Sequence, residues 1–167
     1  AKPPVRMPLP IIYLESHPLD TSISNANFRV AANPIVVKNG GKVLVSAAKA
    51  PAVADLDRIV CEGASEILIS DGCVAKVSSV TTGPTGLTVN GGVLSIVSAT
   101  AFPETADIYL LNGAKLKPDF NGRIKLGRVF VNSAKVPSGV YDAASWIAEG
   151  GTGTLVIGHR GLAILIR

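Results

Sequence analysis

The sequence predicts an all-β protein, folded as a short β-solenoid of about five coils with an extended N-terminal arm. Three observations lead to this fold class. Hydrophobic residues make up 47% of the 167 residues and aromatic residues only 5%, so Val, Ile, Leu and Ala must fill the core. Seventeen glycines and eleven prolines supply frequent turns. A polar residue followed by glycine recurs ahead of alternating apolar segments, which is typical of short strands joined by tight corners.

The recurring step consists of a polar residue, a glycine and a second small residue before an alternating strand. It is found in five segments, which are 37–45, 60–69, 89–96, 111–116 and, more loosely, 150–157. The step predicts a tight corner, because Gly and Asn adopt positive φ with little strain. The glycines of the first four segments, from Gly40 to Gly113, follow one another at similar intervals along the chain. Each interval suits one coil of a solenoid and is too long for a simple hairpin meander.

The repeats divide the chain into an arm at 1–36, a solenoid body at 37–157 and a C-terminal apolar strand at 158–167. The arm carries six of the eleven prolines, which keep its backbone extended and out of central sheet positions. Each terminal segment contains one apolar run where a polar cap would be expected. These runs are candidate assembly strands, made of Ile11, Ile12, Tyr13 and Leu14 in the arm and of Leu162, Ile164 and Ile166 in the tail.

Helix signals are weak along the whole chain. The best candidate, 47–57, is rich in Ala but contains Pro51, so a loop with one helical turn is an equally good interpretation. A second short candidate is 141–147. The remainder predicts strand and turn.

Charge and hydropathy exclude several function classes. The net charge of +4 comes from 16 basic and 12 acidic side chains without a run of five like charges. A nucleic-acid groove needs clustered Lys and Arg with interleaved aromatic residues, so no nucleic-acid partner is expected. No apolar stretch approaches the roughly 18 residues that a membrane-spanning helix requires.

The chain start and the cysteines are compatible with an oxidising compartment. The sequence begins at Ala1 without an initiator Met or a basic and apolar leader, which fits a secreted product after signal removal and equally a trimmed sequence. Cys61 and Cys73 are the two cysteines, and they permit one disulfide bond there. Two buried thiols that act as small core residues are the alternative interpretation.

The segments 87–116 and 129–157 carry a family resemblance. Asn90-Gly91-Gly92 and Asn112-Gly113 before strands, then a Pro-Ser-Gly-Val-Tyr turn at 137–141, Trp146 and Gly-Thr-Gly-Thr-Leu at 151–155 form its pattern. This pattern resembles the closing module of the passenger repeats of bacterial autotransporter-like surface proteins. The resemblance implies a right-handed parallel β-helix of the pectin-lyase type, exported to the cell surface or beyond. Such motifs specify fold and leave function open. The chain departs from usual members in its short length and its proline-rich arm.

The sequence patterns favour a protein without catalysis. Asp55 and Asp57 are the nearest approach to an acid/base or Ca²⁺ pair, as a polysaccharide lyase or hydrolase would need. A solvated loop with a local ion pair is the favoured interpretation of these two residues. The cysteine spacing does not suit zinc, and the glycine pairs do not open a phosphate-binding helix. No cofactor or metal is expected.

The terminal strands give the functional hypothesis. We expect a structural subunit of an extracellular filament, sheath or surface layer, in which copies join by β-strand addition. The alternative is an adhesin or carbohydrate-binding module of a larger surface protein, with extracellular polysaccharide as a partner. In that case Tyr141 and Trp146 are the candidate glycan-stacking residues, although packing of the last coil is the favoured role for them.

Overall fold

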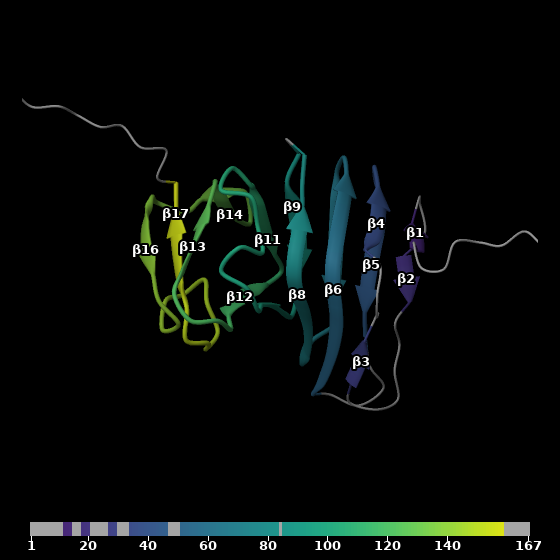
Figure 1. The fold of residues 1–167 in the computed structure, drawn as a ribbon, viewed down its shortest axis with the longest axis horizontal. Helices are drawn as coiled ribbons and strands as arrows, with labels where there is room; N and C mark the ends of the chain where they lie inside the picture. Colours follow the sequence, from purple (N-terminus) through teal and green to yellow (C-terminus); the bar gives the residue numbers. More distant parts are fainter. Residues whose placement is uncertain are drawn as a thin grey trace, which may run out of the picture.

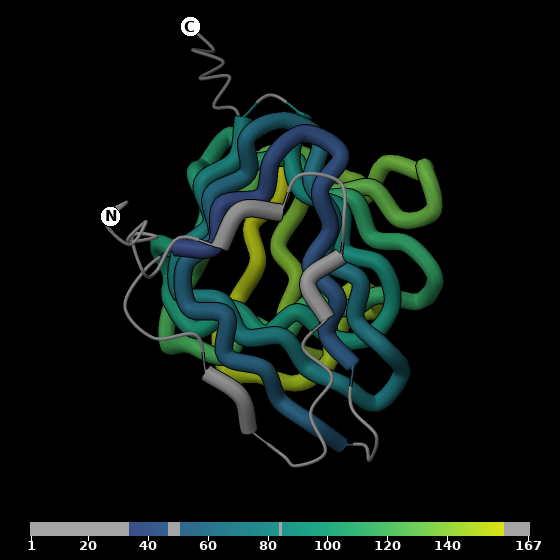
Figure 2. Tube along the Cα trace, turned by 90° about the vertical axis from the view of Figure 1, so that its right-hand side faces the viewer, coloured from purple at the N-terminus to yellow at the C-terminus, as the bar shows by residue number. Residues whose placement is uncertain are grey.

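The described part of the chain is built entirely from strands, turns and loops. The computed structural model describes residues 34–46, 51–83 and 85–158 in full, together with the backbone of 12–14, 18–20 and 27–29. These residues form a parallel β-solenoid of about four turns, close to the expected number. The strands lie across the long axis of the molecule (Figure 1), and the view along that axis shows successive turns stacked around a common centre (Figure 2). The predicted all-β solenoid is confirmed.

Three sheets make up the solenoid. The first contains β1 (Ile12–Leu14), β3 (Asn27–Arg29), β4 (Ile35–Lys38), β6 (Ala52–Glu62), β8 (Cys73–Thr81), β10 (Val93–Ile96) and β12 (Lys115–Pro118). The second contains β2 (Pro18–Asp20), β5 (Lys42–Val45), β7 (Ser65–Ile69), β9 (Leu87–Asn90), β11 (Ile108–Leu111), β14 (Val129–Val131) and β15 (Ala134–Lys135). The third contains β13 (Arg123–Leu126), β16 (Gly139–Tyr141) and β17 (Thr154–Ile157).

Each turn of the solenoid has three faces. The long strands β6 and β8 bend at a corner, so each of them contributes to two faces. Face 1 contains β4, the second half of β6, the end of β8, β13 and β17. Face 2 is the second sheet. Face 3 contains β3, the first halves of β6 and β8, β10 and β12. The spacing of register partners, such as Ile35 with Ile59 and Val74 with Val93, sets the length of one turn, which differs from turn to turn.

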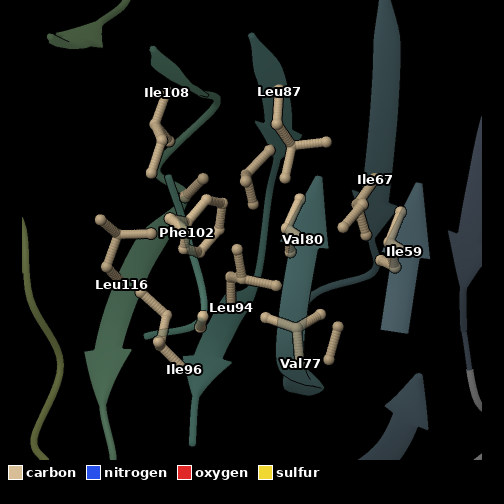
Figure 3. Close-up of a cluster of buried hydrophobic side chains, with 14 of the residues drawn as sticks. Ile59, Ile67, Val77, Val80, Leu87, Leu94, Ile96, Phe102, Ile108 and Leu116 are labelled. Carbon is tan, nitrogen blue, oxygen red and sulfur yellow. The ribbon is translucent and has the colours of Figure 1, made fainter. Parts of the chain in front are cut away.

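The core is a set of stacked aliphatic columns in the solenoid interior. One column follows the register of face 2 through Val43, Ile67, Val89, Leu110 and Val131. Figure 3 shows the central core, where side chains from all three faces point toward one another. Alternation along β7 is strict, with buried Ser65, Ile67 and Ile69 separated by half-buried residues. The low aromatic content thus fits an interior filled mainly by Val, Ile, Leu and Ala.

The recurring glycine step marks corners, but it marks more than one kind of corner. Asn39-Gly40 and Glu62-Gly63 lie between face 1 and face 2. Asn90-Gly91 and Asn112-Gly113 lie one face further along, between face 2 and face 3. The interval from Gly63 to Gly91 therefore spans one turn plus one face, and the sequence alignment of these glycines as equivalent positions is wrong. Any corner that needs positive φ selects the same residues, so the local pattern cannot distinguish the corners.

Neither weak helix candidate forms a helix in its described residues. Residues 52–57 form the first half of β6, which pairs with β8 on one side and with β3 on the other. Within 141–147 the chain makes successive turns, held by hydrogen bonds from the backbone N–H and the hydroxyl of Ser145 to the carbonyl oxygen of Asp142. Pairing on both sides outweighs the helix propensity of the alanines in β6.

The N-terminal segment contributes strands to the first turn. β1 pairs in parallel with β4, β2 with β5, and β3 with β6. The register runs without a break across the expected boundary at residue 36.

Candidate functional site

The N-terminal end of the solenoid is formed by parallel strands. Ile12, Tyr13 and Leu14 pair with Ile35, Val36 and Val37 of β4, so this candidate assembly strand lies on its own chain. β1 and β2 are the outermost strands of their sheets, and among the described residues neither has a neighbour on its outer side. Of the other candidate assembly residues, Ile11, Leu162, Ile164 and Ile166 lie outside the described residues.

The C-terminal end is closed by antiparallel strands. β15 turns back on β14 through Asn132 and Ser133, which both have positive φ, as a tight hairpin requires. β16 pairs antiparallel with β17 on face 1. On face 3, the edge of β12 is covered by the segment 147–153, where Leu116 donates to the carbonyl oxygen of Ile147 at 3.0 Å and accepts from Glu149 at 2.9 Å. Faces 1 and 2 thus end in antiparallel strands, whereas face 3 ends in a parallel bridge between Leu116 and Ala148.

The two ends of the solenoid therefore differ in kind. The described N-terminal end presents a parallel edge that continues the register of the body, and at the C-terminal end faces 1 and 2 finish in antiparallel strands. Unpaired N–H and C=O groups at a strand edge are a template for another strand. A parallel strand can be added in the register of the body at the N-terminal end, whereas the outer edges of β15 and β16 belong to antiparallel hairpins.

The candidate glycan-stacking residues differ in their availability. Trp146 is 54% exposed in the turns that follow β16. Tyr141 on β16 packs against the core, and its hydroxyl donates to the carbonyl oxygen of Pro137 at 2.7 Å. Tyr141 thus fixes the last hairpin, whereas the ring of Trp146 is accessible to a ligand. The ammonium group of Lys115 contacts the carbonyl oxygen of Trp146 and holds this turn on face 3.

The two cysteines are free and lie in different strands. Cys61 is near the end of β6 on face 1, and Cys73 begins β8 on face 3. Both side chains are buried in the core, which agrees with the interpretation as small core residues. Burial raises the pKa of the Cys61 thiol to about 11, although a hydrogen bond with Ser65 acts in the opposite direction. Cys61 is therefore protonated and unreactive at neutral pH.

Asp55 and Asp57 lie at a bulge in β6 and serve the local backbone. The register with β8 shifts on both sides of Asp57, whose φ is +53°. The carboxylate of Asp55 accepts the N–H of Asp57 at 3.1 Å, and the carboxylate of Asp57 accepts the hydroxyl of Ser78. These bonds stabilise a residue in the left-handed region, where a non-glycine residue is strained. The two carboxylates thus have a structural role in the bend between face 3 and face 1.

A polar ladder crosses four turns on the outside of face 2. The Lys42 ammonium lies 2.9 Å from one carboxylate oxygen of Glu66, and the amide of Asn90 donates to the other at 2.7 Å. The amide of Asn112 in turn donates to Asn90 at 2.8 Å. Burial alone would raise the pKa of Glu66, but the hydrogen bonds from Asn90 and Lys42 and the charge of Lys42 lower it overall. The ladder links adjacent turns through side chains, in addition to the backbone hydrogen bonds of the sheet.

Face 2 carries an aromatic pair that was not predicted from the sequence. Tyr109 and Phe130 are register partners on β11 and β14, and their rings stack with centroids 4.9 Å apart and planes 9° from parallel. The guanidinium carbon of Arg128 lies 5.6 Å from the centroid of Phe130. The same guanidinium group donates two hydrogen bonds from Nε to the buried carboxylate of Asp107, at 3.1 and 3.2 Å. The two rings come from neighbouring turns of the solenoid, so only the correct register could have revealed the pair.

The described residues contain neither a metal-binding cluster nor a membrane-spanning helix. Within the described ranges, no group of three or more His, Cys, Asp or Glu side chains could hold a metal ion. No helix long and apolar enough to cross a membrane occurs there either.

The β-solenoid fold agrees with the parallel β-helix that the resemblance implies. No family model, curated protein or solved structure matches the chain significantly.

Proposed function

We propose that this chain is a structural subunit of an extracellular filament, sheath or surface layer, and that copies join by β-strand addition without catalysis. The observation that carries the proposal is the difference between the two ends. A parallel edge at β1 and β2 has the geometry of an acceptor, and the hairpins on faces 1 and 2 of the other end break the parallel register that direct stacking of one solenoid on the next would continue. Joining therefore requires a separate donor strand.

The donor in this proposal is the apolar tail segment with Leu162, Ile164 and Ile166. These three residues alternate, as residues that share one face of a strand do. A tail that leaves the closed end of one copy and pairs with the open end of the next makes a heterologous contact, which propagates into open fibres. The resemblance to autotransporter-like passenger repeats supports an extracellular location and a right-handed path of the solenoid.

Charge substitutions in the tail test the proposal. The triple variant Leu162→Asp, Ile164→Asp and Ile166→Asp should convert polymers into monomers, because an inward-facing charge cannot be buried at an acceptor edge without a large desolvation cost. The control is Val140→Asp, which places one such charge on a 58% exposed position of the C-terminal end and should polymerise like the wild type. Light scattering after size exclusion and negative-stain microscopy measure the outcome. A wild type that is monomeric at all concentrations, or a triple variant that still polymerises, would refute the proposal.

The exposure of Trp146 favours one alternative function, an adhesin or polysaccharide-binding module. An exposed indole ring offers an apolar face to the C–H groups of a sugar. A glycan array with the wild type and with Trp146→Ala separates this alternative from the filament proposal. Selective binding that disappears in the variant would favour the adhesin, whereas a filament subunit gives no selective signal.

A further inference from the structure

One turn of the solenoid lacks a strand on face 1. Between the end of β8 and β13, the loop 97–107 occupies the place of the missing strand. The loop is anchored on both sides, since Val80 donates to the carbonyl oxygen of Ala101 at 2.6 Å and Gly127 donates to that of Ala106 at 2.8 Å. Gly127 packs so closely on the loop that an added Cβ would lie 2.7 Å from the carbonyl oxygens of Thr105 and Ala106. Insertions into a repeat gather on one face and often form the binding face of a solenoid.

A hollow of about 320 Å³ lies between this loop and β13. Its lining combines apolar and polar residues, which are Ala99, Thr100, Phe102, Pro103, Glu104, Arg123 and Lys125. Ala99 and Pro103 form the apolar floor, because Phe102 is only 5% exposed and its ring points into the core near Leu94 and Leu116 (Figure 3). The volume falls at the lower end of the range of small-molecule sites.

The rim of the hollow is basic. Arg123 and Lys125 occupy alternate positions of β13, and both are exposed on its outer side. The Lys125 ammonium lies 3.3 Å from the carboxylate of Glu104, in a pair whose side chains are 60% and 71% exposed. Arg123 has no ion pair with any carboxylate of the described residues. A guanidinium without a protein carboxylate, beside an apolar floor, is suited to two parallel hydrogen bonds with an oxyanion.

We propose that this hollow binds an oxyanion carried on a compact apolar body, such as an aromatic carboxylate or phosphate monoester. The guanidinium of Arg123 binds the anionic group, and the apolar body lies against Ala99 and Pro103. Lys125 adds a second positive charge, which Glu104 partly neutralises. The hydroxyl of Thr100 lies 3.0 Å from the hydroxyl of Ser98 and is a further hydrogen-bond donor at the rim. The site is independent of the assembly proposed above, because neither end of the solenoid contributes to its lining.

Calorimetric titration of the purified chain tests the site, with phenyl phosphate and benzoate as probes. Inorganic phosphate has the anion without the apolar body, and benzyl alcohol has the body without the anion. We expect saturable binding of phenyl phosphate or benzoate, and the stronger of the two identifies the preferred oxyanion. We expect no saturable binding of benzyl alcohol and weaker binding of inorganic phosphate.

Three variants locate the binding. Arg123→Gln should weaken the preferred probe at least about tenfold, which corresponds to about 1.4 kcal/mol. Glu104→Gln should strengthen it, because Lys125 then loses its competing carboxylate. Lys135→Gln is the control, since it makes the same change in net charge as Arg123→Gln at an exposed residue of β15, outside the hollow. The proposal is overturned if neither probe binds, or if Arg123→Gln and Lys135→Gln bind the preferred probe equally well. An unchanged urea midpoint of Arg123→Gln confirms that this variant folds.

Discussion

Substituting Gly92 by Ala tests how tightly one turn packs on the next. Gly92 has a φ of +52°, and an added Cβ would lie 2.7 Å from Cβ of Ile69 and 3.0 Å from the carbonyl oxygen of Cys73, both on the preceding turn. The left-handed backbone costs a non-glycine residue about 1 kcal/mol, and overpacking adds about 1 to 3 kcal/mol. We therefore expect Gly92→Ala to lower the free energy of unfolding by about 2 to 4 kcal/mol.

Gly113→Ala is the matched control, because it isolates the backbone contribution. Gly113 has a φ of +78° at the equivalent corner one turn later, and an added Cβ would meet nothing within 4 Å. This variant should lose only about 1 kcal/mol. Urea unfolding followed by circular dichroism measures both values, and a constant denaturant dependence shows that the two variants unfold in the same way. Equal losses in the two variants would refute the stacking of the Gly92 corner on Ile69.

Three further results follow from the core, the buried thiol and the face 2 ladder. Leu116→Ala should cost about 2 to 5 kcal/mol in the same urea assay, because the side chain is fully buried; a loss below about 1 kcal/mol would contradict its place in the core. Cys61 should resist alkylation at pH 8 in the folded protein, since with a pKa of about 11 only about one thiol in a thousand is ionised. Mass spectrometry that finds equal labelling with and without urea would contradict this expectation. Glu66 has a lowered pKa, so its stabilisation is present above the unfolded value of about 4.3 and is lost as the pH falls through the folded value. The stability difference between wild type and Glu66→Gln should thus shrink in acid, and a difference that is constant from pH 7 to pH 3 would contradict the ladder to Asn90 and Lys42.

The sequence allowed the fold class and the corners to be predicted, but not the arrangement of the corners. Positive φ is a local requirement, so Gly40 and Gly91 stand out equally well in the sequence. Whether a corner joins faces 1 and 2 or faces 2 and 3 depends on which strands pair across turns, and that is a long-range property. For the same reason the alanine-rich stretch 52–57 looked like a loop or helical turn until its two neighbouring strands were known.

Functional surfaces were harder to predict than the fold. Trp146 could be singled out as a rare aromatic residue, and it is exposed. Tyr109 and Phe130 are far apart in the sequence and meet only through the register of β11 and β14. Aligning the chain at the observed turn length, rather than on its glycines, would have placed these two rings side by side. The basic rim at Arg123 depends on a missing strand, for which the glycine pattern contains no signal.

Disulfide trapping between separate copies tests the proposed assembly most directly. Chains with Tyr13→Cys are mixed with chains with Leu165→Cys, because each of these positions alternates with the inward-facing positions of its strand in the proposed assembly. The native Cys61 and Cys73 are retained because both are buried. Strand addition predicts a covalent dimer that contains one copy of each variant, seen on a non-reducing gel and identified by mass spectrometry. Each variant incubated alone should give much less dimer. Mixtures that remain monomeric, or that yield only dimers of like variants, would contradict assembly from the tail of one copy to the open end of the next.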